Sequence, residues 1–490
     1  MESNTQKALK GMSSQTIVTI ILGIVEIGSF SIMSRLLSQK DFGYFAVISA
    51  VLGVFSALSD AGIGSAIVQR KDLDQKFLNN AFTLCFVFGG VTCVALFLSS
   101  NFLASTIVDE SMSTPLKVMS LTLLTSTLSS AYLSILQRQL KFFTIGMINL
   151  MALVITTIIA IALAYYGFGY YAIITKAVLT SVLALMMGAI LSKTKFYLDW
   201  DKMTIKSIWG FSSWLMFSGV FRNFAQQMDR LLMAKLLSVD ALGAYNRPKE
   251  FITQISSKFN NIFDSALFPV LSGIQEDYTK VCSAYKRALS YLNIFSVILM
   301  MSFFFNAELL VRIFFGEQWL SVVPTFQILS CALIFQIDAR LADCFLRSLG
   351  WTKQQFYFRI IEVISQIIGL IIGAQFGVNG VAVSVVVVNV LCILLKNFYI
   401  IKRLGISQIE SIKIILSSWR PMYVLSPIMI LLLRVLPHSL IYNCISTVIF
   451  CVLIGVMLLC FPSTIGDVYK KEVYGKLFNS VKQKLIKHNL

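Results

Sequence analysis

Hydrophobic residues occur along the chain in long blocks, which short polar segments separate. Most blocks contain about 20 residues or more, the length that an α-helix needs to cross a lipid bilayer. The blocks predict 14 membrane-spanning helices, at residues 13–34, 42–64, 80–100, 115–136, 143–165, 171–191, 207–234, 247–271, 288–305, 320–346, 354–375, 380–401, 421–433 and 440–461. The segments 207–271 and 320–346 carry charges and are only weakly hydrophobic, so 12 spans is the main alternative. The pattern predicts an all-α integral membrane protein.

The composition supports this fold class and argues against most enzymes. Hydrophobic residues make up 57% of the 490 positions and charged residues 13%, whereas soluble domains average about 25% charged residues. Only two histidines occur, His438 and His488, and the sequence contains no phosphate-binding loop, dinucleotide-binding motif or paired-aspartate motif. We therefore expect no enzyme activity, no cofactor and no metal site. The nine cysteines lie mostly in apolar spans, where reduced, buried thiols are expected.

The net charge of +17 comes mainly from loops and tails. Alternate segments, namely 1–12, 65–79, 137–142, 192–206, 272–287, 347–353, 402–420 and 462–490, contain 26 Lys and Arg, and the intervening segments contain six. Positively charged loops stay on the cytoplasmic side of a membrane. The asymmetry therefore predicts that both termini are cytoplasmic, and it accounts for the basic balance without nucleic acid as a partner.

A repeat divides the chain into two halves. The segment Leu36-Leu37-Ser38 with Gly43 recurs as Leu236-Leu237-Ser238 with Gly243, at the ends of the first and the seventh span. Two six-helix halves of this kind form a cleft that opens alternately to each side of the membrane. We expect a first bundle at 1–192, a second at 207–402, accessory helices 13 and 14 at 420–461 and a basic cytoplasmic tail at 462–490.

Ionisable side chains inside membrane spans are costly and usually face a cavity or a partner. In this chain they follow one helix face in each of four spans of the second half. These stripes contain Arg222, Gln226, Asp229 and Arg230; Arg247, Glu250, Gln254, Lys258, Asn261 and Ser265; Gln336, Arg340, Asp343 and Arg347; and Arg359, Glu362 and Gln366. Their basic residues outnumber their acidic residues by seven to four. The excess favours an anionic substrate, and because the arginine fork suits phosphate, a diphosphate is the natural candidate.

A structural explanation of the same stripes stays open. Arg222 with Asp229, or Arg359 with Glu362, would then neutralise each other and hold the helices together. In the first half, intramembrane charges are sparse and comprise Glu26, Asp60, Lys117 and Lys176. Glu26 lies deep in the first span, where a carboxyl group could exchange a proton as the cleft opens, or could simply pack as a neutral or paired group.

Five segments resemble the Wzx-type polysaccharide flippases, the colanic-acid and O-antigen flippases of the multidrug/oligosaccharidyl-lipid/polysaccharide exporter superfamily. They are LSDAGIGSAIVQRKDL at 58–73, LQRQLKFFTIGMIN at 136–149, AKLLSVDALGAYNR at 234–247, LFPVLSGIQED at 267–277 and FGEQW at 315–319. Several of these segments lie in loops, where a shared hydrophobic composition alone would not make them match the family's sequences. Gln69-Arg70-Lys71 and Gln137-Arg138 match basic loops of the family and place cytoplasmic loops rather than a site.

The resemblance implies a flippase in the bacterial inner membrane that moves an undecaprenyl-diphosphate-linked oligosaccharide to the periplasmic leaflet by alternating access. It also implies partners, which are the lipid-linked oligosaccharide, membrane lipid and the polysaccharide polymerase with its chain-length machinery. Family members use cationic residues in the cleft. The substrate-binding candidates in this chain are Arg222, Arg230, Lys258, Arg340 and Arg359, the sugar path would contain Gln226, Gln254 and Asn261, and coupling candidates are Glu26, Asp229 and Glu362.

Two other functions compete with this interpretation. A drug or cation antiporter of the same superfamily should have an anionic cleft, and the cationic excess argues against it. A membrane polymerase or glycosyltransferase would need a substantial catalytic loop outside the membrane, whereas the longest loops, 65–79 and 402–420, are short. Transport of a lipid-linked glycan is therefore the function that the sequence favours.

Overall fold

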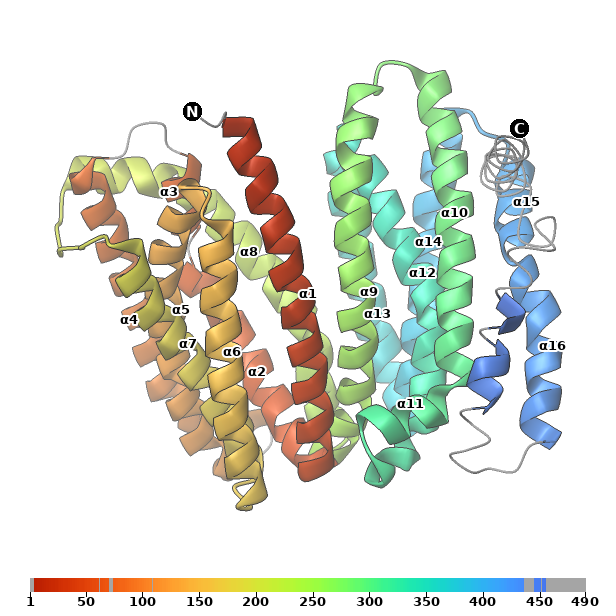
Figure 1. Cartoon of the computed structure of the whole chain (residues 1–490), viewed down its shortest axis with the longest axis horizontal. Coiled ribbons are helices and arrows are strands. Elements are labelled where there is room, and N and C mark those ends of the chain that lie inside the picture. Colours follow the sequence, from red (N-terminus) through yellow and green to blue (C-terminus); the bar gives the residue numbers. More distant parts are fainter. Residues whose placement is uncertain are drawn as a thin grey trace, which may run out of the picture. The chain divides into compact units, whose positions relative to one another are not determined.

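The structure is a computed structural model that describes residues 4–60, 62–69, 74–107, 109–435, 445–450 and 452–454, and within these ranges every regular element is a helix (Figure 1). The first ten elements are α1 (Asn4–Leu36), α2 (Gln39–Asp60), α3 (Ile63–Gln69), α4 (Gln75–Ile107), η1 (Glu110–Met112), α5 (Ser113–Arg138), α6 (Phe142–Tyr165), α7 (Tyr170–Ser192), α8 (Lys202–Leu236) and α9 (Val239–Gly273). They are followed by α10 (Tyr278–Phe305), α11 (Ala307–Phe314), η2 (Glu317–Val322), α12 (Val323–Ser348), α13 (Thr352–Ala374), α14 (Gly377–Leu404), α15 (Gln408–Ser418) and α16 (Arg420–Val435). The all-α fold class is confirmed.

Eleven helical segments of the described chain are long and apolar enough to cross a membrane, so this is a multi-pass membrane protein. Helices α8 and α9 are not among them, although each has 35 residues. Their polar stripes lower the hydropathy, as expected for 207–271, whereas the segment Glu317–Ser348 qualifies as a span. The predicted span at 440–461 lies largely outside the described residues, and the total of 14 spans stays a prediction.

The chain divides into two compact units, which are described separately. Unit 1 comprises Met1–Asn246 with Phe314–Gly316, and unit 2 comprises Arg247–Ile313 with Glu317–Leu490. The boundary lies inside α9, and α8 packs against α2 within unit 1. This boundary differs from the predicted one between residues 192 and 207. The bundles at 1–192 and 207–402 therefore stay a prediction about which helices move together during transport.

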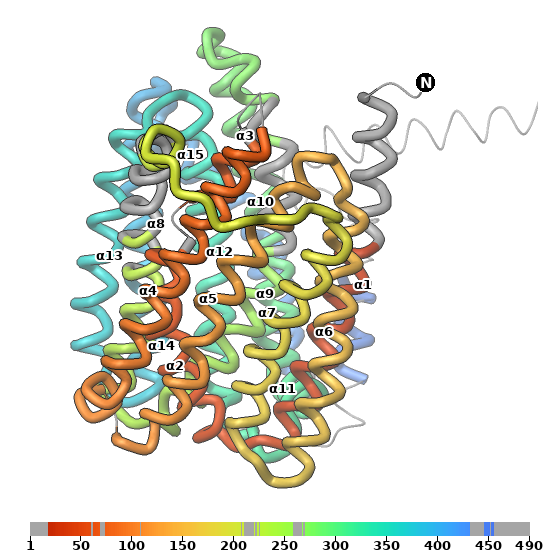
Figure 2. Tube along the Cα trace, turned by 90° about the vertical axis from the view of Figure 1, so that its left-hand side faces the viewer, coloured from red at the N-terminus to blue at the C-terminus, as the bar shows by residue number. Residues whose placement is uncertain are grey.

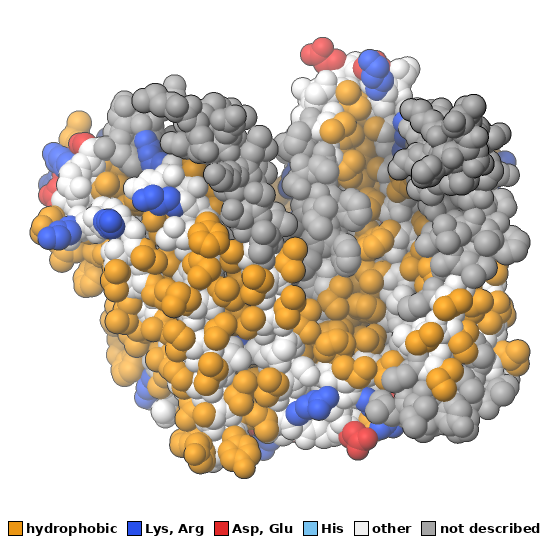
Figure 3. All heavy atoms as spheres, in the orientation of Figure 1, with side chains coloured by type: hydrophobic (Ala, Val, Ile, Leu, Met, Phe, Trp, Pro, Cys, Tyr) orange, Lys and Arg blue, Asp and Glu red, His pale blue; other side chains and the backbone are white. Residues whose placement is uncertain are grey.

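Small side chains and hydroxyl groups hold unit 1 together. Helix α4 packs along α5, and α7 lies between α5 and α6 (Figure 2). Ser59 of α2 is the centre of a buried network, with its Oγ 2.9 Å from Thr92 Oγ1 of α4 and 2.9 Å from Thr127 Oγ1 of α5. In a bilayer, close packing and interhelical hydrogen bonds replace the hydrophobic drive between helices. The face of this unit that Figure 3 shows is largely covered with hydrophobic side chains.

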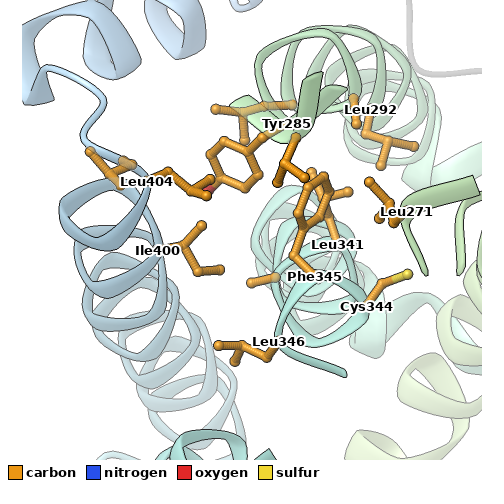
Figure 4. Packing of buried hydrophobic residues seen from close by; sticks show 14 of the residues in the cluster. Leu271, Tyr285, Leu292, Leu341, Cys344, Phe345, Leu346, Ile400 and Leu404 are labelled. Atoms are coloured by element: carbon orange, nitrogen blue, oxygen red, sulfur yellow. The ribbon is translucent and has the colours of Figure 1, made fainter. Parts of the chain in front are cut away.

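Unit 2 has an apolar core between α9, α10, α12 and α14 (Figure 4). Tyr285 and Phe345 meet edge to face, with ring centroids 4.9 Å apart. The Tyr285 hydroxyl donates to Asn397 Oδ1 at 2.9 Å, which satisfies its polar tip inside the core. Leu341 and Ile400 fill the space beside the two rings. This packing fixes α12 against α14, two of the three helices that carry charged residues of the candidate site.

The two copies of the sequence repeat form the same corner, and the two corners touch each other. Helix α1 ends at Leu36 and α8 ends at Leu236, each three residues before the next helix begins. A Cβ atom added to Gly43 would lie 1.9 Å from the carbonyl oxygen of Val239. One added to Gly243 would lie 1.9 Å from the carbonyl oxygen of Gln39. The contact is therefore reciprocal, and only a residue without a side chain fits on either side.

Replacing Gly43 with alanine is expected to reduce the folded protein by about tenfold, because a rigid backbone contact cannot absorb a methyl group and overpacking costs about 1–3 kcal/mol. Gly243→Ala should have the same effect. Gly23→Ala on α1 is the control, since a Cβ at Gly23 meets nothing within 4 Å. Size-exclusion chromatography of fluorescent fusions measures the folded fraction. Wild-type yield and melting temperature for Gly43→Ala would contradict the contact.

Candidate functional site

A cluster of four charged side chains joins three membrane-spanning helices of unit 2. Lys396 of α14 lies at its centre, with 2% of the side chain exposed. Its Nζ is 3.0 Å from Oδ1 of Asp343 on α12 and 3.3 Å from Oε2 of Glu362 on α13. A buried ammonium group needs such partners because an unpaired charge in an apolar interior is strongly unfavourable. Lys396 therefore ties α14 to both neighbouring helices.

Arg359 is the second cation of this cluster. It precedes Glu362 by one turn of α13, and its Nη1 is 3.2 Å from Oε1 of that residue. Its Nη2 is 3.7 Å from Oδ2 of Asp343. The Arg359 side chain is 48% exposed, and a guanidinium group has five N–H donors. Arg359 is therefore the member of the cluster that can also bind an anion that is not part of the cluster.

The charges of the four residues balance. The pair of Arg359 and Glu362 that the structural explanation of the stripes expects is present at 3.2 Å, and each of the two carboxylates contacts both cations. Two positive and two negative side chains add no net charge to this part of unit 2. Any attraction for an anionic substrate here must come from the donors that Arg359 exposes, or from cations outside the cluster.

Sequence reasoning missed Lys396 because it followed stripes of polar residues. Helix α14 has no such stripe, and Lys396 is the only charged residue of α14 before Lys402 and Arg403 in its last turn. That isolation is itself a signal, since a lone intramembrane charge needs a partner on another helix. Asp338 was missed because it lies off the polar stripe of α12; this residue is 4% exposed and accepts a 2.8 Å hydrogen bond from Asn293 Nδ2.

Two further predicted cations have described side chains. Arg340 of α12 is exposed and forms no ion pair with any described residue. Arg230 of α8, in unit 1, donates through Nε to Asn246 Oδ1 at 3.0 Å and through Nη1 to Gln227 Oε1 at 3.2 Å. The backbone N–H of Arg230 donates to Asp229 Oδ1 at 2.9 Å. Arg230 is thus held by polar partners near the end of α8.

The remaining candidates of the stripes lie partly outside the described residues. Gln226 is exposed and Gln254 is half-buried. The backbones at Arg222, Lys258 and Asn261 are helical, but their side chains lie outside the described part of the chain. Their roles in substrate binding and in the sugar path stay predictions.

The predicted coupling residue Glu26 lies in a polar part of unit 1. It is half-buried on α1, one turn before Ser29. Lys176 of α7 donates through Nζ to Ser29 Oγ, and Thr157 of α6 donates to the same oxygen at 3.4 Å. Three helices of unit 1 therefore meet at polar side chains in the membrane, beside the only acidic residue of the first predicted span.

Comparison with known proteins agrees with this architecture. The chain is 24% identical over 431 residues to the lipopolysaccharide biosynthesis protein WzxC of Escherichia coli (strain K12), covering 87% of each chain. It is 23% identical over 372 residues to the teichuronic acid biosynthesis protein TuaB of Bacillus subtilis (strain 168), covering 73% of this chain and 74% of the relative. The fold is similar to that of the lipid II flippase MurJ in an inward closed conformation, with a TM-score of 0.69 and 16% identity over 90% of this chain and 98% of that chain.

The resemblance noted in the loop segments is confirmed by these matches. The family of polysaccharide biosynthesis proteins matches residues 32–324. This stretch includes the repeated corners, the polar stripes of α8 and α9 and all five segments quoted above. Because the match covers more than half of the 490 residues, this chain belongs to the polysaccharide biosynthesis protein family.

Proposed function

We propose that the protein is a flippase that moves a polyprenyl-diphosphate-linked oligosaccharide repeat unit across the bacterial inner membrane by alternating access. The repeat unit would serve the synthesis of a capsule, an exopolysaccharide or an O-antigen. Family membership supports a role in polysaccharide synthesis, and the similarity of fold to a lipid II flippase supports movement of a lipid-linked substrate. The proposal involves no covalent chemistry, so the protein would not be an enzyme.

The observation that carries this proposal is the half-exposed Arg359 inside a membrane-embedded ion cluster. A planar guanidinium group binds phosphate through two parallel hydrogen bonds. When Arg359 turns toward a diphosphate, Lys396 remains 3.0 Å from Asp343 and 3.3 Å from Glu362 and continues to balance part of their charge. The cluster can therefore release Arg359 to a substrate without leaving two bare carboxylates in the membrane.

The other predicted residues have supporting roles in this proposal. Arg222, Arg230, Lys258 and Arg340 would add positive charge along the substrate path. The amide groups of Gln226, Gln254 and Asn261 would form hydrogen bonds with the hydroxyl groups of the sugars. The polyprenyl chain would stay in lipid. Glu26, Asp229 and Glu362 are the candidates for coupling to an ion gradient.

The charge asymmetry of the loops supports an orientation with both termini in the cytoplasm. The bundles at 1–192 and 207–402 would move relative to each other, with accessory helices at 420–461 and a basic tail at 462–490. The polysaccharide polymerase and its chain-length machinery would receive the flipped repeat unit. These partners follow from the order of the steps, because polymerisation consumes the product of flipping.

Deleting the gene is expected to abolish the surface polysaccharide and to leave lipid-linked repeat units on the cytoplasmic face of the inner membrane. Surface glycan is measured with a lectin or antiserum. The position of the lipid-linked units is measured in sealed spheroplasts with a glycosidase that cannot cross the membrane. Protection of the accumulated units from the glycosidase supports flipping. Cleavage of these units would indicate a block after flipping, as for a polymerase, and normal surface glycan would exclude both roles.

A further inference from the structure

Unit 1 contains an open, basic pocket that the proposed transport step does not use. Its volume is about 640 Å³, and it lies where the first turn of α4, the last turn of α5 and the segment after α7 meet. Among the described residues that line it, Arg138, Lys193 and Lys195 are cations and none is acidic. Gln75 and Tyr197 are among the uncharged polar residues of the wall. The pocket is thus a concentrated positive site at one end of the helices.

The pocket is built by a segment that is firmly attached to α4. Gln75 Nε2 donates to the backbone oxygen of Lys195 at 2.9 Å, and the backbone N–H of Tyr197 donates to Asn79 Oδ1 at 3.2 Å. Phe196 stacks on Phe82 with ring centroids 4.5 Å apart. On the opposite side, Arg138 Nη1 donates to the backbone oxygen of Ile67 at 3.2 Å. The cations are therefore displayed on a defined framework rather than on an unsupported loop.

Two acidic residues that closely follow the pocket segment in sequence, Asp199 and Asp201, are engaged outside the lining. Asp201 caps α8 by accepting from the backbone N–H of Thr204 at 3.0 Å, and it pairs with Lys76 at 3.2 Å. Hydrogen bonds from Thr204 and the contact with Lys76 lower the pKa of Asp201 to about 2. Asp199 accepts a 3.1 Å hydrogen bond from Asn80 Nδ2. These carboxylates already have donors, so they leave Lys193 and Lys195 without an acidic partner among the described residues.

The side chains beside the pocket indicate its depth in the membrane. Tyr197, Leu198 and Trp200 are 62%, 65% and 59% exposed, and Met203 is 79% exposed. Exposed tyrosine and tryptophan are typical of the interface between lipid tails and water, where the lipid headgroups lie. Lys and Arg side chains gather at this end of unit 1, next to the hydrophobic surface of its helices (Figure 3).

We propose that this pocket binds the phosphate headgroup of a membrane lipid, in the leaflet on the side of the basic loops. Basic pockets at helix ends bind anionic lipid headgroups in this way. The space exceeds that of one phosphate and admits a headgroup, while the acyl or prenyl chain would lie along the apolar surface below Leu198 and Trp200. Both an anionic phospholipid and a polyprenyl phosphate provide this chemistry.

The test uses the purified full-length protein in a neutral detergent. The melting temperature is followed during titration with phosphatidylglycerol, undecaprenyl phosphate, phosphatidylcholine or inorganic phosphate. We expect the anionic lipids to stabilise the protein, and the lipid that acts at the lower concentration identifies the source. Lys193→Gln/Lys195→Gln should raise the concentration needed for half of the effect roughly tenfold or more. Neither lysine side chain forms a hydrogen bond or ion pair with another described residue, so folding should be unaffected.

The matched control is Lys202→Gln/Lys206→Gln. It removes two exposed cations from the same end of unit 1, outside the pocket, and should leave the titrations unchanged. Equal stabilisation of the Lys193/Lys195 variant and the wild type would overturn the proposal. So would an equal loss in the control, which indicates a diffuse surface effect, or full stabilisation by inorganic phosphate alone. Because no readout depends on transport, this result is independent of the proposed flipping.

Discussion

Replacing Lys396 with methionine is expected to reduce the folded protein in the membrane by more than tenfold. The substitution keeps the length of the side chain but removes the cation that lies 3.0 Å from Asp343 and 3.3 Å from Glu362. Those side chains are only 12% and 17% exposed, whereas the side chain of the remaining cation, Arg359, is 48% exposed. Removing one partner of a buried ion pair costs about 3–5 kcal/mol, because the other charge stays buried without compensation.

A second substitution should reverse most of this loss. In Lys396→Met/Asp343→Asn, the remaining pair of Arg359 and Glu362 is again neutral, so the folded amount should return to within about threefold of the wild type. Lys402→Met, at the exposed end of the same helix, is the matched control and should have no effect. Chromatography of fluorescent fusions gives the folded amount, and the melting temperature gives the stability. A Lys396→Met protein with wild-type values in both would show that the cluster contributes nothing to folding.

Replacing Arg359 with alanine should lower polysaccharide export about tenfold or more, with a much smaller change in protein level. The first effect follows because a charge-assisted hydrogen bond contributes roughly 1.5–3 kcal/mol. The second follows because Lys396 still contacts both carboxylates and because Arg359, with 48% of its side chain exposed, is the less buried of the two cations. Arg359→Lys keeps the charge but loses the fork of donors, and an intermediate defect is expected. Surface glycan per unit of membrane protein is the quantity to measure.

The double substitution Arg359→Ala/Glu362→Gln distinguishes substrate binding from ion pairing. It leaves Lys396 and Asp343 as a neutral pair at 3.0 Å, so any protein lost in Arg359→Ala should return while export stays low. Lys117→Ala is the control for loss of an intramembrane charge. It removes a half-buried cation of unit 1 that is distant in sequence from Arg359. If the double variant regains export together with protein, Arg359 acts only through its ion pairs. Normal export at normal protein level in Arg359→Ala would exclude it from the site.

Features that depend on short stretches of chain could be predicted from the sequence alone. Long apolar blocks predict membrane helices because each block must satisfy its own backbone hydrogen bonds in lipid. The weak hydropathy of 207–271 was visible as polar stripes, and the pairing of Arg359 with Glu362 follows from their i, i+3 spacing on one helix. The repeat indicated both corners, and the helix ends at Leu36 and Leu236 lie two residues beyond the predicted span ends.

Features that depend on which helices pack together could not be predicted in this way. Nothing in the local pattern places Lys396 against residues 34 and 53 positions earlier in the chain. The contact between Gly43 and the carbonyl oxygen of Val239, and the meeting of Arg138 with Lys193 and Lys195 at one pocket, likewise join distant segments. Helix periodicity states which face of each helix is polar, but in a membrane the small residues and hydrogen bonds of the packed interface decide which faces meet. The contacts between these helix faces set the charge balance of the site, so it could be known only from the tertiary structure.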